Sequence, residues 1–312
     1  MMEPQAKYIP KTRQDWQQKR KEFIGASEIP TILGLNPYKS PYQLWLEKTQ
    51  RETPDVENQH TRRGQLLEQA VADYFEKDTG SRIIKSSAKD VMYIHKEHPF
   101  IGGTPDRFYY PKEKDGKRVL ECKTTMKQVD EIPLPWYVQL QVYLGLTGTD
   151  QGAIAWLSSH FGFNFGNVSL DFDDSTYALA IQAAVNFYTE YWQKDMPPKA
   201  TTVADVQKMF RQHSEGKLKE VNSDMYEKHR RLAMLKQQAK ELDDQIKSIE
   251  DEIKMQYTDC EGMTYGGEVI STWKTTKEIE KFDKAGFRKQ YPDIYSKFKI
   301  MEPGQRRFTI KI

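Results

Sequence analysis

The chain has 312 residues, 38% hydrophobic and 29% charged, which is enough for one large domain or two smaller ones with a sizeable core. Its net charge of +2 does not indicate a nucleic-acid binder, so any contact with DNA requires a local groove. No apolar run reaches the roughly 18 residues that span a membrane, Met1–Arg13 has no apolar signal-peptide core, and two cysteines exclude a disulfide framework, so we expect a cytoplasmic protein.

Residues 14–29 predict a helix followed by a bend. The apolar residues that fit one buried side of that helix are Trp16, Phe23 and Ile24. Gly25-Ala26-Ser27 then breaks the helix, and Ser27 is expected to cap the next one. A bend with free amides, a hydroxyl and Arg20 nearby suits a bound phosphate, although a plain helix–turn–helix corner explains the same residues.

Two further helices are expected, one from Ser40 with Pro41 in its first turn and one over residues 63–75. The apolar residues on the inner face of the latter are Leu67, Val71, Tyr74 and Phe75. Glu68 lies beside this stripe, where a lone carboxylate is costly without a cation or a donor. An exposed glutamate that merely flanks the stripe is the other interpretation.

Short strands are expected at residues 82–85 and 91–94, before the Gly102-Gly103 pair. Glycines at this point permit close backbone approach or positive φ. His98 precedes them in a Glu-His-Pro turn, and we interpret it as structural and not as a metal ligand or general base.

The stretch from Asp106 to Lys123 has the clearest chemical pattern. A polar turn lets residues 108–110 and 119–121 pair as a hairpin, which would bring Asp106 beside Glu121. Because side chains alternate along a strand, Glu121 and Lys123 should project together. This pattern predicts two carboxylates and an ammonium at one edge of a sheet.

Two converging carboxylates stay ionised most readily when they share a hard cation such as Mg²⁺. Such an ion can polarise a phosphoryl oxygen and activate water near neutral pH, and Lys123 can orient that water. An ordinary hairpin with a surface Glu/Lys pair is the alternative, since Glu-x-Lys is very common.

A helix is expected over residues 136–146, after Pro133 and Pro135. Gln139 and Tyr143 are four residues apart and therefore lie on one side of it. Gln141 is an adjacent candidate for the same role as Gln139. A polar edge on a core helix explains these residues equally well.

Strands at residues 152–158 and 165–170 and a helix over 177–192 would complete a mixed sheet flanked by helices. Pro197-Pro198 marks a linker. Beyond it, apolar residues alternate by three and four from 225 to 253, which predicts a coiled coil or long antiparallel helix whose partner is this chain or another.

The last segment predicts strands at residues 268–274 and 306–311 around a helical stretch at 282–295. Both strands interleave basic and aromatic residues, a pattern that could contact nucleic acid. A small packed unit is the other interpretation.

Five elements, in this order, resemble the PD-(D/E)XK nuclease superfamily, and within it the lambda-type exonucleases known as YqaJ-type viral recombinases. They are Trp16/Arg20/Gly25-Ala26-Ser27, Arg63-Gly-x-x-x-Glu68, Gly102-Gly-x-x-Asp106, Glu121-x-Lys123 and Gln139-x-x-x-Tyr143. Each is weak alone, but their joint order and spacing are far more specific. The resemblance spans residues 14–195.

The resemblance implies a restriction-endonuclease-like α/β core and a metal-dependent exonuclease. Such an enzyme digests linear double-stranded DNA from the 5′ end and leaves a 3′ single-stranded overhang for phage recombination by strand annealing. An endonuclease of the same superfamily and a non-catalytic DNA-binding assembly protein are the alternatives. We expect three domains: the nuclease core at 1–197, a helical or coiled-coil extension at 198–265 and a small α+β unit at 266–312.

By the same resemblance, Asp106, Glu121 and the backbone carbonyl of Cys122 would bind Mg²⁺, for which Mn²⁺ could substitute. Glu68 would join them for a second ion. Lys123 would orient and activate the attacking water.

The remaining assignments concern the DNA. Gln139 or Gln141 would hold the water or the scissile phosphate, with Tyr143 lining the site. Arg20, assisted by Ser27, would engage the 5′-phosphate of a DNA end. The resemblance also implies a homotrimeric ring around DNA, a single-strand annealing protein as partner and, for a phage protein, the host cytoplasm as location.

Overall fold

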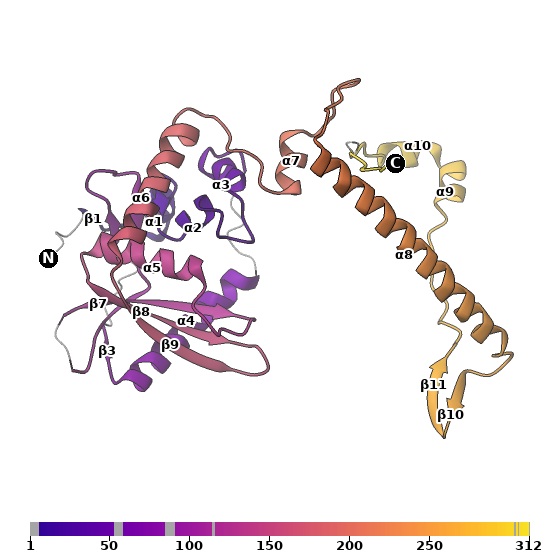
Figure 1. Cartoon of the computed structure of the whole chain (residues 1–312), viewed down its shortest axis with the longest axis horizontal. Coiled ribbons are helices and arrows are strands. Elements are labelled where there is room, and N and C mark those ends of the chain that lie inside the picture. Colours follow the sequence, from indigo (N-terminus) through magenta and orange to yellow (C-terminus); the bar gives the residue numbers. More distant parts are fainter. Residues whose placement is uncertain are drawn as a thin grey trace. The chain divides into compact units, whose positions relative to one another are not determined.

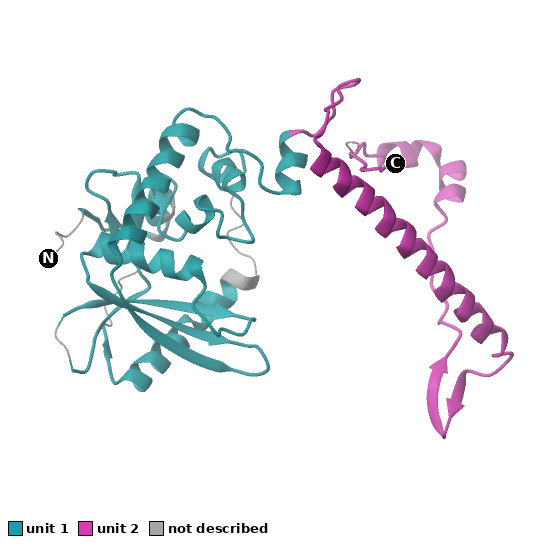
Figure 2. Cartoon of the chain, viewed as in Figure 1, with its two compact units in different colours: residues 1–209 teal, residues 210–312 magenta. Residues whose placement is uncertain are grey.

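The computed structural model describes residues 6–52, 59–84, 91–113, 116–302, 304 and 306–311. Two compact units divide the chain, Met1–Met209 and Phe210–Ile312 (Figure 2). In the part of the chain that the structure describes, no helix is long and apolar enough to cross a membrane.

The first unit is organised on a five-stranded sheet with the order β3-β6-β7-β8-β9 (Figure 1). Its strands are β3 (Arg82–Ile83), β6 (Arg107–Tyr110), β7 (Arg118–Thr125), β8 (Gln151–Ser158) and β9 (Asn164–Asp171). Strands β7 and β8 run parallel and the other neighbours run antiparallel. The predicted mixed sheet is therefore confirmed. Lys85, at the end of the predicted strand 82–85, lies outside the described residues.

Helices cover both faces of this sheet (Figure 1). Helix α4 (Gln59–Thr79) packs on one face and α5 (Leu134–Thr147) on the other, with α6 (Asp174–Phe187) against α5. The other helical segments of the unit are α1 (Arg13–Arg20), α2 (Ile29–Ile32), α3 (Pro41–Lys48), a π-helical turn after α6 (Tyr188–Trp192), and α7 (Val203–Met209). Alternation along β7 assigns the faces: Val119 packs in the cluster that includes α5 and α6, and Leu120 packs against α4. Both faces of β7 are therefore buried, as parallel pairing between helices requires.

The predicted hairpin is also confirmed. Strands β6 and β7 pair antiparallel with Phe108 opposite Val119 and Arg107 opposite Leu120. This register places Asp106, the residue before β6, at the level of Glu121. The crossover from β7 through α5 to β8 then brings α5 over the face to which Glu121 points.

A second, four-stranded sheet has the order β1-β4-β5-β2, and the sequence did not predict three of its strands, β1, β2 and β5. The strands are β1 (Ala6–Tyr8), β2 (Ile24–Gly25), β4 (Met92–Ile94) and β5 (Ile101–Gly103). The helix expected to bury Ile24 ends instead at Arg20, because Ile24 pairs with Ile101 in a parallel bridge. This bridge fixes the chain just before the Gly-Ala-Ser bend.

The first unit extends beyond the Pro197-Pro198 linker because a buried carboxylate fastens α7 to it. Asp205 Oδ1 accepts a hydrogen bond from Ser40 Oγ at 2.7 Å, and Oδ2 accepts from the Thr201 and Thr202 amides at 3.0 Å each. Ser40 is also the N-cap of α3, with a complete capping box. The division into three domains at 197 and 265 stays a prediction.

The second unit contains α8 (Ser223–Met255), β10 (Gly262–Tyr265), β11 (Glu268–Thr272), α9 (Lys284–Gln290) and α10 (Pro292–Lys297). The long helix predicted from the heptads is present and starts at an Asn222 cap. The strand predicted at 306–311 is wrong: β11 pairs instead with β10 across the Gly266-Gly267 turn. The helix expected over 282–295 is interrupted before Pro292, which lacks the amide that helix continuation needs.

We predict that Asp205→Ala lowers the free energy of unfolding of the first unit by about 2–3 kcal/mol, because it leaves buried donors unsatisfied. Burial alone raises the pKa of Asp205, but the hydrogen bonds from Ser40, Thr201 and Thr202 outweigh it and lower the pKa below the ordinary 3.8. The carboxylate therefore stabilises the fold fully above about pH 4, and this contribution is lost as the pH falls through the folded-state pKa.

Denaturant unfolding at pH 7 and at pH 3 checks this. Asp150→Ala, which removes an exposed carboxylate, is the control and should change stability by less than about 0.5 kcal/mol. Equal losses for the two variants, or a loss for Asp205→Ala that grows at acid pH, would contradict the prediction.

Candidate active site

The carboxyl-terminal half of β7 presents Glu121 and Lys123 toward α5, where Gln139 joins them. Gln139 Nε2 donates to Glu121 Oε1 at 2.7 Å, and Lys123 Nζ donates to Gln139 Oε1 at 2.8 Å. Lys123 Nζ also lies 2.7 Å from Glu121 Oε1. The three side chains form one closed network, and Glu121 is only 3% exposed. A buried carboxylate is thus compensated on one of its two oxygens.

Tyr143 extends this network by one helical turn. Its hydroxyl accepts from Gln139 Nε2 at 3.2 Å. Burial, and then the charges of Glu121 and Asp106, raise the pKa of Tyr143 well above its usual value. The phenol therefore stays neutral and remains available as a hydrogen-bond donor.

Asp106, which directly precedes β6, contacts the neighbouring strand β7 beside Glu121. Its Oδ2 accepts from the Cys122 amide at 2.9 Å, across the hairpin register. Burial, and then the charges of Glu121 and Glu68, raise the pKa of Asp106 well above its usual value, against the opposing effect of Lys123. Negative charge is therefore crowded at this point in a way that a cation would relieve.

Glu68 approaches from α4 and forms an ion pair with Arg107, whose NH1 lies 2.6 Å from Glu68 Oε1. The side chains are 11% and 18% exposed respectively, so this pair is largely shielded from water. Arg107 follows Asp106 directly in the chain. It balances part of the charge that Asp106, Glu121 and Glu68 bring together.

The donor set suits a hard divalent cation. Glu121 Oε2 is buried and has no hydrogen-bond partner among the described residues. Together with Asp106 and the Cys122 carbonyl it offers the oxygen ligands that Mg²⁺ and Mn²⁺ prefer. Within the described ranges no group of three or more His, Cys, Asp or Glu residues forms a ready metal cluster. Glu68 is directed to Arg107 instead of completing one.

The Gly-Ala-Ser bend is held from behind by Glu28 and Lys48. Glu28 Oε2 accepts from the Gly25 amide at 2.7 Å and lies 2.6 Å from Lys48 Nζ, and Lys48 also donates to the Phe23 carbonyl at 2.8 Å. Ser27 was expected to cap the next helix, but Glu28 is the N-cap residue of α2 and the Ser27 side chain is exposed. The longer carboxylate reaches back to Gly25 and leaves the serine hydroxyl free to face the cleft.

Glycine is required where the bend meets β5. The Ala26 amide donates to the Gly102 carbonyl at 2.9 Å. A Cβ on Gly103 would lie 2.7 Å from the Tyr143 ring and 3.1 Å from Ala26. The close backbone approach expected at these glycines is confirmed, and it puts the bend directly against α5.

Arg20, at the end of α1, is exposed and lies with its guanidinium 5.1 Å from the Trp16 ring centre. Its charge is close enough to lower the pKa of Tyr143 in part. The neighbouring Lys19 is occupied by Glu22 at 2.7 Å. Of these two cations, Arg20 is thus the better candidate to bind a phosphate.

One cleft of about 690 Å³ unites these groups. The predicted residues that line it are Arg20, Ser27, Glu68, Asp106, Glu121, Cys122, Lys123, Gln139 and Tyr143. Gln141 does not belong to this set. Its Nε2 donates to the Asp171 carbonyl at 3.0 Å and its Oε1 accepts from the Asp173 amide at 2.8 Å, so it ties α5 to the β9–α6 connection. Of the two glutamines, Gln139 alone faces the cleft.

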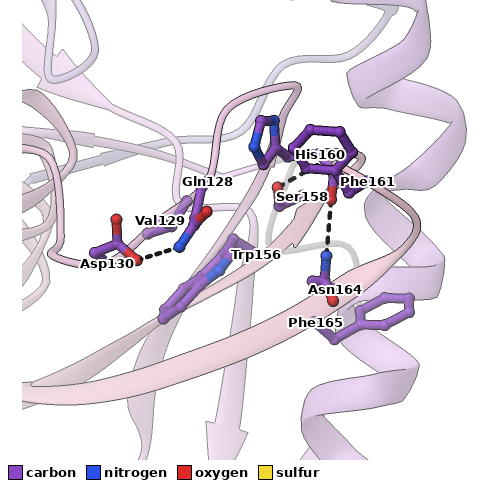
Figure 3. A pocket seen from close by; sticks show the side chains of 9 residues that line it. All are labelled: Gln128, Val129, Asp130, Trp156, Ser158, His160, Phe161, Asn164 and Phe165. Carbon is purple, nitrogen blue, oxygen red and sulfur yellow. Dashed lines mark hydrogen bonds between the residues drawn. The ribbon is translucent and has the colours of Figure 1, made fainter.

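A second cavity, of about 490 Å³, lies at the connection between β8 and β9 (Figure 3). It is lined by Gln128, Val129, Asp130, Trp156, Ser158, His160, Phe161, Asn164 and Phe165. Its polar groups bond mainly to each other: Gln128 donates to Asp130 at 2.6 Å and Asn164 to the His160 carbonyl at 2.9 Å (Figure 3). None of the predicted site residues lines it, and neither does His98, whose ring stacks on His95.

Comparison with known proteins places the chain in a family. Residues 15–150 match the family described as the YqaJ-like viral recombinase domain. The chain is 30% identical over 319 residues to the uncharacterized protein YqaJ of Bacillus subtilis (strain 168), covering 98% of this chain and 96% of that protein. The chain belongs to the YqaJ family. The family prediction made from the five motifs is confirmed.

More distant similarities exist. A protein of Acanthamoeba polyphaga mimivirus is 26% identical over 163 residues, 46% of this chain and 29% of that protein. Among solved structures, the alkaline exonuclease LHK-Exo from Laribacter hongkongensis aligns with 58% of this chain and 93% of its own, at 17% identity and a TM-score of 0.47. The fold described above rests on the strand order and pairing of this chain alone.

Sequence reasoning missed three residues that shape the site: Arg107, Glu28 and Lys48. Arg107 directly follows Asp106, and its strand position opposite Leu120 signalled that it faces α4. Glu28 stands three residues after Gly25, the distance at which a carboxylate reaches back to an amide. Nothing local indicated that Lys48 would meet it.

We predict that Lys48→Met lowers the free energy of unfolding by about 2–4 kcal/mol, because it leaves Glu28 as an uncompensated, largely buried charge. Denaturant unfolding measures this. The matched control is Lys39→Met, which removes a more exposed lysine 2.7 Å from Glu47 and should cost about 1 kcal/mol or less. Similar losses in both variants would show that Glu28 is not held as described.

Proposed function

We propose that this protein is a metal-dependent exonuclease that digests linear double-stranded DNA from the 5′ end and leaves a 3′ single-stranded overhang. The observation that carries the proposal is the convergence of Asp106, Glu121 and Lys123 in one cleft, with Glu121 Oε2 buried and lacking a partner among the described residues. Membership of the YqaJ family supports it.

A divalent cation, Mg²⁺ or Mn²⁺, would be held by Asp106, Glu121 and the Cys122 carbonyl, with Glu68 available for a second ion. When bound it would neutralise the crowded carboxylates and polarise a phosphodiester oxygen. The raised pKa of Asp106 has the same origin as this affinity, since burial and neighbouring carboxylates disfavour its charge until a cation arrives.

Lys123 acts on the attacking water and on the phosphate. Glu121 and Gln139 hold its ammonium in place. The N–H group that these contacts leave over is therefore directed into the cleft before the substrate binds. The oxygen of the water forms a bond to phosphorus and the water releases a proton to solvent, while the bond to the 3′ oxygen of the terminal nucleotide breaks and that oxygen takes up a proton from solvent. Lys123 stabilises the charge that develops on the phosphoryl oxygens.

Gln139 is a positioning residue in this proposal. It donates to Glu121 and Tyr143 and accepts from Lys123, so it fixes the spacing between acid and ammonium. An amide can do both at once, because it carries donors and an acceptor.

Arg20 and Ser27 would bind the 5′-phosphate of the DNA end. Arg20 offers a fork of donors suited to phosphate oxygens, and Ser27 presents a hydroxyl on a bend with nearby amides. Each cleavage leaves a 5′-phosphate on the next nucleotide, so the same contacts can be made again. This recurrence would give the reaction its direction.

The overhang would serve recombination by strand annealing, with a single-strand annealing protein as partner. A homotrimeric ring around DNA remains the assembly expected for the nuclease core. Both belong to the proposal and follow from the resemblance of the motifs.

We predict that Asp106→Asn, Glu121→Gln and Lys123→Met each reduce digestion of linear duplex DNA by about 10²–10⁴-fold in the presence of Mg²⁺. Release of nucleotides is the measurement, and Mn²⁺ binding followed by electron paramagnetic resonance should weaken in the two acid variants. Asp73→Asn and Lys77→Met, on the exposed side of α4, are the controls and should keep full activity. Nicking of covalently closed circles by the wild type would indicate an endonuclease instead.

We predict that Arg20→Ala removes the preference for 5′-phosphorylated over 5′-hydroxyl ends, lowering kcat/KM on phosphorylated ends by about 10–100-fold, as loss of a charge-assisted contact would. Lys19→Ala, one residue away and paired with Glu22, should keep the preference. A loss in both variants, or in Lys19→Ala alone, would assign the phosphate to another cation.

A further inference from the structure

Helix α8 exposes an apolar stripe along its whole length. The helix has 33 residues and none of them is buried, so it extends about 50 Å at 1.5 Å per residue. The apolar residues of the stripe are Met225 (42% exposed), Leu232 (36%), Leu235 (51%), Leu242 (56%), Ile246 (49%), Ile249 (58%) and Ile253 (42%). Within the described residues of its unit, nothing covers this stripe. A stripe of this length and spacing is the seam of a coiled coil.

The heptad positions follow from the spacing. Core positions a fall at 225, 232, 239, 246 and 253, and core positions d at 228, 235, 242 and 249. The seam contains one charged residue, Lys228, near its beginning. Lys228 Nζ binds Asp224 at 2.7 Å and so is directed away from the seam.

From residue 229 onward, the charges that flank the seam are segregated along the helix. Positions e and g in the first half carry His229, Arg231 and Lys236. In the second half they carry Asp243, Glu250 and Glu252. Of the remaining flanking residues, Gln238 and Gln245 are neutral, and Asp224, at the start of the helix, is acidic but binds Lys228 of its own helix at 2.7 Å. Because e and g residues meet across the interface, this order decides which orientation a second copy can take.

A parallel pair is disfavoured. There each g residue faces the following e residue of the other helix, which sets Arg231 against Lys236. Gln238 and Gln245 would face Asp243 and Glu250 and form no ion pair, and Asp224 would face His229. A parallel dimer thus contains the Arg231–Lys236 repulsion twice, against a single kind of complementary contact, between Asp224 and His229.

An antiparallel pair combines apolar core layers with complementary flanking charges. If Ala239 of one copy lies opposite Leu242 of the other, the core layers are Leu232 with Ile249 and Leu235 with Ile246. These layers combine apolar residues, and Ala239 makes room for the larger Leu242 at the centre. Lys228 lies opposite Ile253 in the layer at the end of the seam, where its contact with Asp224 directs the ammonium outward.

The flanking residues match in the same register. Arg231 faces Glu252 of the second copy, and Lys236 faces Asp243. His229 faces Glu250. Each of these contacts occurs twice by symmetry, and none of them brings like charges together.

We propose that α8 joins two copies of this chain as an antiparallel coiled coil. The interface lies wholly in the second unit and uses no residue of the cleft, so it stands whether or not the proposed nuclease activity is correct. Two first units would thereby be tethered to opposite ends of one rod.

The test uses the full-length chain and measures its mass by light scattering over a range of concentrations. The wild type is expected at twice the chain mass, or at an even multiple if the first units also associate. Leu242→Asp should halve the mass, because it puts a carboxylate into two central layers. Met234→Asp is the matched control: Met234 is apolar and 61% exposed but lies outside the seam, so the mass should not change. An unchanged thermal transition of the first unit verifies folding.

A charge exchange tests the orientation. Lys236→Glu places a carboxylate opposite Asp243 in the antiparallel pair and should raise the dissociation constant roughly tenfold, while in a parallel pair it would relieve the repulsion from Arg231 and tighten binding. Combining it with Asp243→Lys should restore the wild-type constant. Lys240→Glu, of equal charge change at an outward position, is the control.

Lys236→Glu also removes the contact between Lys236 and the Phe308 ring, 6.0 Å away. The double variant does not replace that contact, so restored association in it would show that the charge pair between the two copies is responsible. A monomeric wild type, an odd-numbered assembly that Leu242→Asp dissociates, a mass indifferent to Leu242→Asp, or tighter association by Lys236→Glu would each overturn the proposal.

Discussion

The burial of Glu121 is the constraint on which the site in the first unit depends. A carboxylate that is 3% exposed requires compensation, and a strand covered on both faces by helices cannot provide it from solvent. Helix α5 supplies it through Gln139, which binds one oxygen and positions Lys123, while the other oxygen has no described protein partner. The parallel β7–α5–β8 crossover places that helix over that strand. Fold and chemistry are therefore linked through one side chain.

The same logic explains why a second set of charges lies behind the cleft. Glu28 fixes the Gly25 amide, and its own charge is compensated by Lys48 from α3. The bend is thus held by a buried ion pair and leaves Ser27 exposed toward the cleft. A loop that rests on such a pair keeps its shape when a ligand binds, which lowers the entropic cost of ordering it. Gly103 adds the close packing against Tyr143 that a side chain would prevent.

The sequence predicted those features that depend on residues close together in the chain, and it failed where the deciding contact comes from a distant residue. The facing of Glu121 and Lys123 follows from strand alternation, and their approach to Asp106 follows from the hairpin register; the structure has both. Gln139 and Gln141 could not be separated, because every residue from Val138 to Leu146 is buried and α5 has no solvent face to orient it. Only the partners on β7 and at Asp171 distinguish them. The strand expected at 306–311 failed because strand pairing depends on a neighbour that propensity does not reveal.

A net charge of +2 conceals local order in both units. In the first unit, Asp106, Glu121 and Glu68 converge and are offset by Lys123 and Arg107, while Arg20 lines the same cleft. In α8, the residues that flank the apolar stripe are basic at Arg231 and Lys236 and acidic at Asp243, Glu250 and Glu252, an order that defines a direction along the helix. The heptad spacing predicts a partner helix, but it is identical when read from either end. The sequence of charges is not, and it therefore carries the information about orientation that the apolar seam lacks.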